Sequence, residues 1–141
     1  MTVSLFGHRK LYGQNKEVAS RLSTCIDELI KNGATGFFLG DYGEFDQLAA
    51  SVLNKKKVND PQIRMVLVLP YLDKKIDTTI RYDEFIYPPL EKTPKRYAIV
   101  KRNEWMIRNS DAVVVYCMNS YGGAFAALQY AEKQGKRIFR I

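Results

Sequence analysis

The fold class is decided by the stretch "SDAVVVYCMNSYGGAFAALQYAEKQGKRIFRI" (110–141). Its near-continuous apolar run at 111–117 is typical of a strand that is buried on both faces of a sheet. A glycine-containing loop follows, then a helix that begins near Gly122 and ends at Gly135, and then a further strand, "KRIFRI". Because strand, helix and strand in succession form the crossover unit of parallel sheets, this stretch predicts an α/β fold.

The same alternation runs through the rest of the chain. Strands are predicted at 2–6, 35–40 and 63–69, and helices from about Lys16 to Gly33, along one face that follows residue 44, and over about 97–109. The face after residue 44 carries Phe45, Leu48, Ala49, Val52 and Leu53. We therefore predict one domain, 1–141, with a three-layer, Rossmann-like, doubly wound parallel sheet of five strands in the order 3-2-1-4-5.

The segment 70–96 interrupts this alternation. It carries four prolines, several aromatic residues and many charges. Loops of this length inside a compact domain are usually functional. We predict a lid over the ligand site, in which Tyr82 or Tyr87 either stacks on a base or packs the lid onto the body.

Composition restricts the class of partner. The chain has 141 residues, a formal net charge of +7 and no apolar run long enough to span a membrane. No secretory leader precedes the first strand, so we expect a cytoplasmic protein without a membrane partner. The basic residues are spread out and no nucleic-acid-binding motif is present, which makes nucleic acid the less favoured anionic partner. The two cysteines, Cys25 and Cys117, have no metal-ligand spacing, and we expect neither a metal nor a cofactor.

Loops that contain glycine follow the first, second and fourth predicted strands. In parallel sheets of this kind the ligand lies beyond the carboxyl ends of the strands, where the strand order reverses. We therefore expect these loops, "FGHRK", "LGDYGEFD" and "CMNSYGGA", to share one crevice with the start of the third helix. The predicted ligand-binding residues are Gly7, His8, Arg9, Gly40, Asp41, Gly43, Arg102, Asn103, Asn119, Ser120, Gly122 and Gly123.

The residue types in this set favour a phosphate. Gly122 and Gly123 let a ligand approach the unpaired N–H groups at a helix start, although they also suit a plain tight turn. Asn119 or Ser120 either caps that helix or touches the ligand.

Each of the remaining polar candidates has an alternative role. His8 is a phosphate donor, a proton shuttle or a plain hydrogen-bonding group. Arg9 and Arg102 bind phosphate or lie on the surface. Asp41 and Asp46 accept ribose hydroxyls, or else Asp41 caps the second helix and Asp46 faces solvent.

The two commonest nucleotide-binding signatures are absent. The first strand is not followed by GxGxxG, and GxxxxGK[ST] does not occur. This excludes classical dehydrogenases and phosphate-loop ATPases.

The combination of "FGHR", "GDYGEFD", "AIVKRNEWMI", "SDAVVVYCMNSYGGA" and "GKRIFRI" resembles the SLOG superfamily. This Rossmann-like group includes the LOG nucleotide phosphoribohydrolases and the DNA-processing protein DprA, and the chain looks closest to its small, single-domain bacterial or phage-type members. The resemblance implies a nucleotide or a nucleotide-derived ligand, and it makes a homodimer an expectation.

The same resemblance places doubt on catalysis. LOG enzymes carry GGxGTxxE, and Arg102, Gly122 and Gly123 match their arginine and paired glycines, with Asn103 in place of a lysine. The position of the glutamate holds Gln129. In a second register, similar to nucleoside deoxyribosyltransferases, it holds Ala127.

A carboxylate is needed to stabilise or attack the ribosyl cation, and glutamine cannot replace it. We therefore expect a protein that binds or senses a nucleotide. The alternative is an N-glycosidase or base-exchange enzyme with a relocated carboxylate, for which the candidates are Glu44, Asp46 and Glu104.

Overall fold

The computed structural model describes residues 1–76 and 78–141. Six parallel strands form one sheet: β1 (Thr2–Gly7), β2 (Gly36–Leu39), β3 (Arg64–Val68), β4 (Glu84–Ile86), β5 (Ala112–Tyr116) and β6 (Arg137–Arg140). The helices are α1 (Asn15–Lys31), α2 (Glu44–Asn59), α3 (Lys95–Arg108) and α4 (Gly122–Lys133). The α/β class and the parallel sheet are confirmed, and the described chain forms a Rossmann-like fold.

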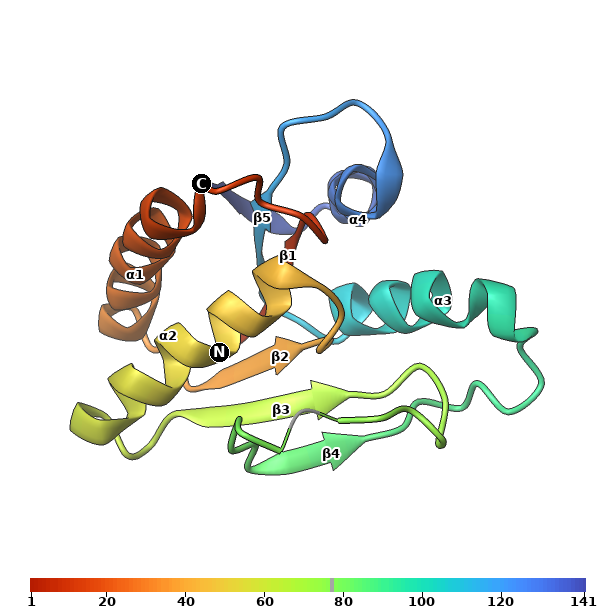
Figure 1. Ribbon diagram of the computed structural model, residues 1–141, viewed down its shortest axis with the longest axis horizontal. Helices are drawn as coiled ribbons and strands as arrows, with labels where there is room; N and C mark the ends of the chain where they lie inside the picture. The colour runs from red at the N-terminus through yellow and green to blue at the C-terminus, as the bar shows by residue number, and fades with distance from the viewer. Residues whose placement is uncertain (77) are drawn as a thin grey trace.

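The helices cover the sheet in pairs (Figure 1). The apolar stripe of α1, at Val18, Leu22, Ile26 and Leu29, packs with α2 residues on one face. Residues of α3 and α4, among them Met106 and Leu128, form a second buried cluster on the other face. The sheet is therefore buried on both sides, and every residue of β5 is buried, as the apolar run at 111–117 predicts.

The predicted number of strands is wrong. The sheet has six strands in the order β4-β3-β2-β1-β5-β6, because β4 lies within the segment 70–96. The other five strands keep the predicted relative order, so the reversal still lies between β1 and β5. The strand was missed because three residues at a sheet edge, between charges and prolines, carry almost no periodic signal.

The strand β4 is fixed to β3 by backbone and side-chain hydrogen bonds. The backbone N–H of Asp83 donates to the carbonyl of Met65, at 2.8 Å, and the N–H of Leu69 donates to Ile86, at 2.7 Å. The carboxylate of Asp83 accepts the N–H of Met65 at 2.7 Å and pairs with Lys57 of α2. This part of the segment 70–96 belongs to the body of the domain.

No helix among the described residues is long and apolar enough to cross a membrane.

Candidate functional site

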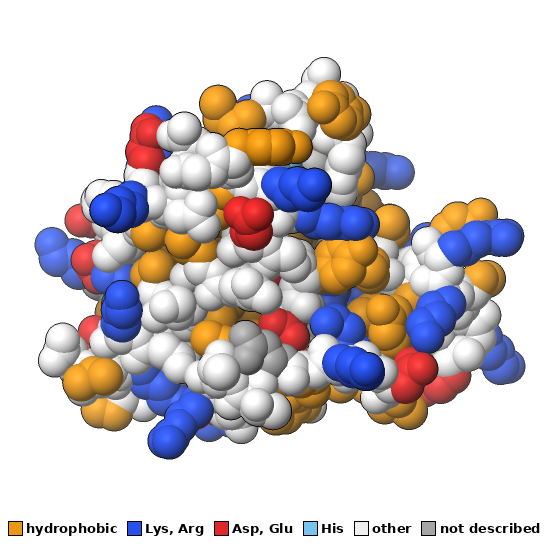
Figure 2. Space-filling model, in the orientation of Figure 1, with side chains coloured by type: hydrophobic (Ala, Val, Ile, Leu, Met, Phe, Trp, Pro, Cys, Tyr) orange, Lys and Arg blue, Asp and Glu red, His pale blue; other side chains and the backbone are white. Residues whose placement is uncertain are grey.

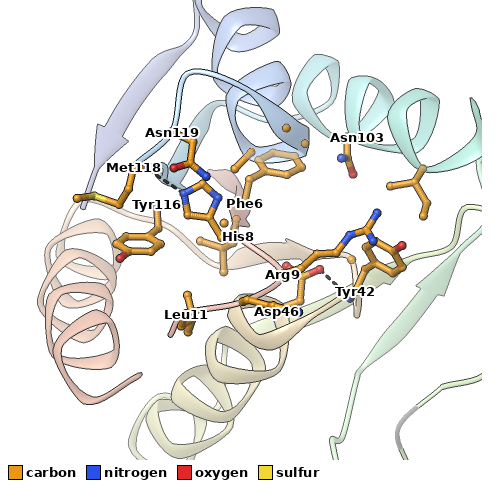
Figure 3. Close-up of a pocket in the computed structure, with 18 of the residues that line it drawn as sticks. Phe6, His8, Arg9, Leu11, Tyr42, Asp46, Asn103, Tyr116, Met118 and Asn119 are labelled. Atoms are coloured by element: carbon orange, nitrogen blue, oxygen red, sulfur yellow. Dashed lines mark hydrogen bonds between the residues drawn. The ribbon is translucent and has the colours of Figure 1, made fainter. Parts of the chain in front are cut away.

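A cavity of about 590 Å³ opens at the carboxyl ends of β1 and β5 (Figure 3). This volume suits a small-molecule ligand. The loops after β1, β2 and β5 and the inner face of α3 form its walls, as the strand reversal predicts. Nine of the twelve predicted ligand-binding residues line it: Gly7, His8, Arg9, Gly40, Arg102, Asn103, Asn119, Gly122 and Gly123.

The other three predicted residues lie outside the cavity wall. Asp41 is buried behind it, and its carboxylate lies 3.7 Å from the ammonium of Lys74. Gly43 is the N-cap residue of α2, so the alternative in which Asp41 caps this helix is wrong. Gly43 has φ 100°, and a Cβ there would lie 2.6 Å from the Cα of Arg9. Ser120 is exposed in the loop before α4.

Of the three candidate catalytic carboxylates, Glu44, Asp46 and Glu104, one lines the cavity and two do not. Glu44 accepts the N–H of Leu11 at 3.1 Å, and Glu104 pairs with Lys101 on α3 at 3.3 Å. Neither lines the cavity, whereas Asp46 does. Asp46 is only 8% exposed, so the alternative of a solvated helical face is wrong for it.

Arg102 forms the buried floor of the site. It is 2% exposed, so the alternative of a surface arginine is also wrong. Its Nη1 donates to the carbonyls of Gly40, at 3.1 Å, and Val68, at 2.7 Å, and its Nε donates to Oδ1 of Asn103, at 2.8 Å. Its Nη2 makes no hydrogen bond within the described chain, and Arg102 lines the cavity. A buried guanidinium therefore keeps donors for an anionic ligand.

Gly40 is required by this arrangement. A Cβ at Gly40 would lie 2.8 Å from Nη2 of Arg102 and 3.0 Å from Oδ2 of Asp46. Gly7 is confined in a similar way, because a Cβ there would overlap the ring of Phe45. Gly40 thus brings the backbone close to two charged groups and Gly7 brings it close to an aromatic ring, and neither is a simple turn residue.

Burial shifts the pKa values of Asp46 and Arg102. It raises the pKa of Asp46 from 3.8 to about 6, while Arg102 and the N–H of Tyr42 oppose the rise only in part. The Tyr42 N–H donates to Oδ2 of Asp46 at 2.8 Å. Burial also lowers the pKa of Arg102 from its usual value, against the attraction of Asp46. The cavity therefore holds a buried cation beside a carboxylate that titrates just below neutral pH.

His8 joins the two loops at the strand reversal. Its Nε2 accepts the N–H of Met118 at 2.7 Å, and its ring meets Tyr116 edge-on at 5.5 Å. Figure 3 shows the imidazole turned toward the loop that holds Met118 and Asn119. Burial lowers the pKa of His8, which favours the neutral form that this hydrogen bond needs. Its Nε2 is therefore occupied by the protein, and His8 positions the loop after β5.

Arg9 extends along the cavity beside Tyr42 (Figure 3). Its guanidinium carbon lies 4.2 Å from the centroid of that ring, a cation–π contact. The contact holds a second positive group in the cavity wall without neutralising its charge.

The N-terminus of α4 is open to the cavity. No side chain caps it, and a Cβ at Gly122 or Gly123 would meet nothing within 4 Å among the described residues. Gln129, at the position of the glutamate in the LOG register, is exposed, and Ala127, at its position in the nucleoside deoxyribosyltransferase register, is buried in the second core cluster. Neither lines the cavity.

The segment 70–96 does not line the cavity at any described residue; position 77 lies outside the described residues. Tyr82 packs against the first core cluster and meets Phe85 edge-on at 5.9 Å, which favours the packing alternative for this tyrosine. Lys74 reaches Asp41, and Tyr71 contacts Lys95. Closure as a lid stays a prediction.

Sequence reasoning missed several lining residues, notably Tyr12, Tyr42, Met118 and Tyr121. Tyr42, Met118 and Tyr121 lie within the loops that were predicted to converge, and Tyr12 lies two residues beyond the predicted loop "FGHRK". The signal that could have found them is an aromatic or apolar side chain in a surface loop, where it does not pack into the hydrophobic core.

The wider surface adds little to this site. On the face in Figure 2, lysine and arginine side chains are interspersed with acidic and apolar ones. No group of three or more potential metal ligands gathers in the part of the chain that the structure describes.

Comparison with known proteins bears on the fold of the chain and not on its function. No family model matches the chain, and no curated protein matches it. Among solved structures it is similar to the X-ray structure of TM1055, a target of the Northeast Structural Genomics Consortium. The match covers 97% of this chain and 71% of TM1055, with 18% sequence identity and a TM-score of 0.64. This likeness supports a Rossmann-like α/β fold.

Proposed function

We propose that this protein is a SLOG-type module that binds or senses a nucleotide or a nucleotide-derived phosphate ligand. The observation that carries the proposal is the meeting of two anion-binding features in one cavity. These are the uncapped N-terminus of α4 at Gly122 and Gly123 and the buried Arg102, whose Nη2 is left without a partner in the described chain. N–H donors and a guanidinium in one partly buried space favour a phosphate.

The same cavity offers groups for the rest of a nucleotide. Asp46, ionised at neutral pH, accepts hydroxyl groups, and Asn103 uses Oδ1 on Arg102 while its amide NH2 remains a donor. Aromatic side chains lie on the wall. The polar groups suit a ribose phosphate, and the aromatic ones suit a base.

Replacement of Gly123 tests the proposal with little risk to the fold. Gly123 has no positive φ, and an added Cβ meets no neighbour. An aspartate there is favourable at a helix N-terminus, so Gly123→Asp keeps or raises the melting temperature. Its charge repels a phosphate, and we expect calorimetry to show at least an approximately tenfold loss of affinity for AMP.

Gly123→Asn is the matched control, since it has the same shape without the charge. It should bind AMP much more tightly than Gly123→Asp does, and inorganic phosphate should compete with AMP. The proposal fails if the wild-type protein binds none of a panel of nucleoside monophosphates, cyclic nucleotides and ADP-ribose.

An N-glycosidase is the second candidate, and Asp46 is the observation that favours it. A buried carboxyl group with a pKa of about 6 in a ligand cavity is suited to general acid–base work. We prefer binding for two reasons. Asp46 is the one candidate carboxylate on the cavity wall, whereas glycosidases commonly use two. Asp46 also already accepts the N–H of Tyr42.

Incubation with AMP and dAMP distinguishes the two candidates. Binding alone predicts intact nucleotide after long incubation. Release of free base that disappears in Asp46→Asn, while AMP still binds, would assign the enzymatic function.

A further inference from the structure

Tyr12 occupies a backbone conformation that tyrosine disfavours. The N–H of Gln14 donates to the carbonyl of Leu11 at 3.0 Å, and the two residues between them, Tyr12 and Gly13, have φ 50° and 81°. Positive φ at both central residues is the geometry of a type I′ turn, which favours Asn-Gly or Asp-Gly. A bulky side chain at the first position is strained.

The strain is not offset by packing. Tyr12 is 84% exposed, so its ring buries little surface in the protein. The other non-glycine residue with positive φ in the described chain is Asp41, a type that tolerates this conformation. An asparagine in place of Tyr12 would fit the turn better and lose no core contact.

The location of Tyr12 suits a role in ligand binding. Tyr12 lines the cavity that also contains the α4 N-terminus and Arg102. The loop before α4 contributes the exposed Met118 and Tyr121 to the same cavity. Residues with a strained backbone cluster at ligand-binding sites, where the side chain contributes to function.

We propose that Tyr12 is a ligand-contacting residue whose ring stacks on the nucleobase at the mouth of the cavity. This inference rests on the proposed function. It adds a contact to the nucleobase, which the phosphate site does not contact. Stacking uses the face of the base, so it tolerates purines and pyrimidines alike.

The test compares ligands with and without a base. Calorimetry measures the affinities of AMP, UMP and ribose 5-phosphate for the wild-type protein, Tyr12→Asn and Tyr12→Phe. In Tyr12→Asn we expect the affinities of AMP and UMP to fall about tenfold. The affinity of ribose 5-phosphate should be unchanged, and Tyr12→Phe should bind all three ligands like the wild type.

Thermal unfolding without ligand supplies the second readout. Because the asparagine relieves the strained turn, the melting temperature of Tyr12→Asn should rise by roughly 2–4 °C, while that of Tyr12→Phe should not. Tyr97→Ala removes an exposed tyrosine of α3 that does not line the cavity, and it should leave all three affinities unchanged.

Three outcomes would overturn this inference alone. One is AMP binding that Gly123→Asp abolishes and Tyr12→Asn leaves intact. Another is an equal loss of AMP and ribose 5-phosphate in Tyr12→Asn, which would assign a role to the loop and not to the ring. The third is unchanged binding with an altered sedimentation coefficient, which would assign Tyr12 to contact with a second copy of the chain. A wild-type protein that binds none of the three ligands would remove the proposed function as well.

Discussion

At the scale of single residues, Asp46 links the site to the stability of the fold. Its pKa is raised to about 6 in the folded protein, above the value of about 3.9 for an unfolded chain. The folded state therefore binds more protons than the unfolded state between about pH 4 and pH 6. The contribution of Asp46 to the free energy of unfolding must then fall as pH rises through that window.

Asp46→Asn should remove this dependence while it still accepts the N–H of Tyr42. We expect the stability of the variant relative to wild type to increase by about 2 kcal/mol between about pH 4 and pH 6.5. Urea unfolding at several pH values measures this difference, and the exposed Glu91→Gln is the control. A difference that stays constant across the window would mean that Asp46 is not perturbed.

Individual site residues were predictable to different degrees. His8 and the paired Gly122 and Gly123 were found because their loops follow strands that meet at one edge of the sheet. Arg102 was found because the start of the third predicted helix was expected at the same crevice. Their partners were not predictable, since the hydrogen bond from Met118 to His8 joins residues 110 positions apart. The burial of Asp46 was missed because an acidic residue in the first turn of a helix is usually solvated.

At the scale of elements, β4 is the main departure from the prediction. Its attachment depends on Asp83, which takes a hydrogen bond from Met65 and an ion pair from Lys57 of α2. Burial acts to raise the pKa of Asp83, but Lys57 and the Met65 N–H together outweigh it, so the pKa is lowered. A lowered carboxyl pKa contributes stability above about pH 4, and this contribution is lost as pH falls further.

Asp83→Asn should lower the free energy of unfolding by about 1 kcal/mol at neutral pH, because Lys57 loses its partner. Amide exchange at 84–86 should accelerate, and the difference from wild type should shrink below about pH 4. Asp73→Asn breaks the exposed pair with Lys95 and should change little. Equal effects of both substitutions would show that β4 does not depend on Asp83.

The longer elements were predicted to within a residue or two at most ends. The apolar stripe of α1 and the β5 run report tertiary burial directly, so pattern alone finds them. The segment 70–96 has no such pattern. Its described part divides between the edge strand β4 and loop residues such as Lys74, which reaches Asp41 behind the cavity.

At the scale of the whole molecule, the order of the predicted strands follows from two rules. Crossovers between parallel strands are right-handed, and successive strands lie next to each other except at one reversal. Those rules place β1 beside β5, which brings the loop after β1 to the N-terminus of α4. The fold therefore locates the cavity, while the ligand, self-association and cytoplasmic location stay predictions.

A crystal structure of the protein grown with saturating AMP tests the central claim most directly. We predict phosphate density within hydrogen-bonding distance of the backbone N–H groups at Gly122 and Gly123, with Nη2 of Arg102 directed at the same anion. An ordered structure whose cavity at the N-terminus of α4 remains without ligand, or which holds AMP elsewhere on the molecule, would contradict it.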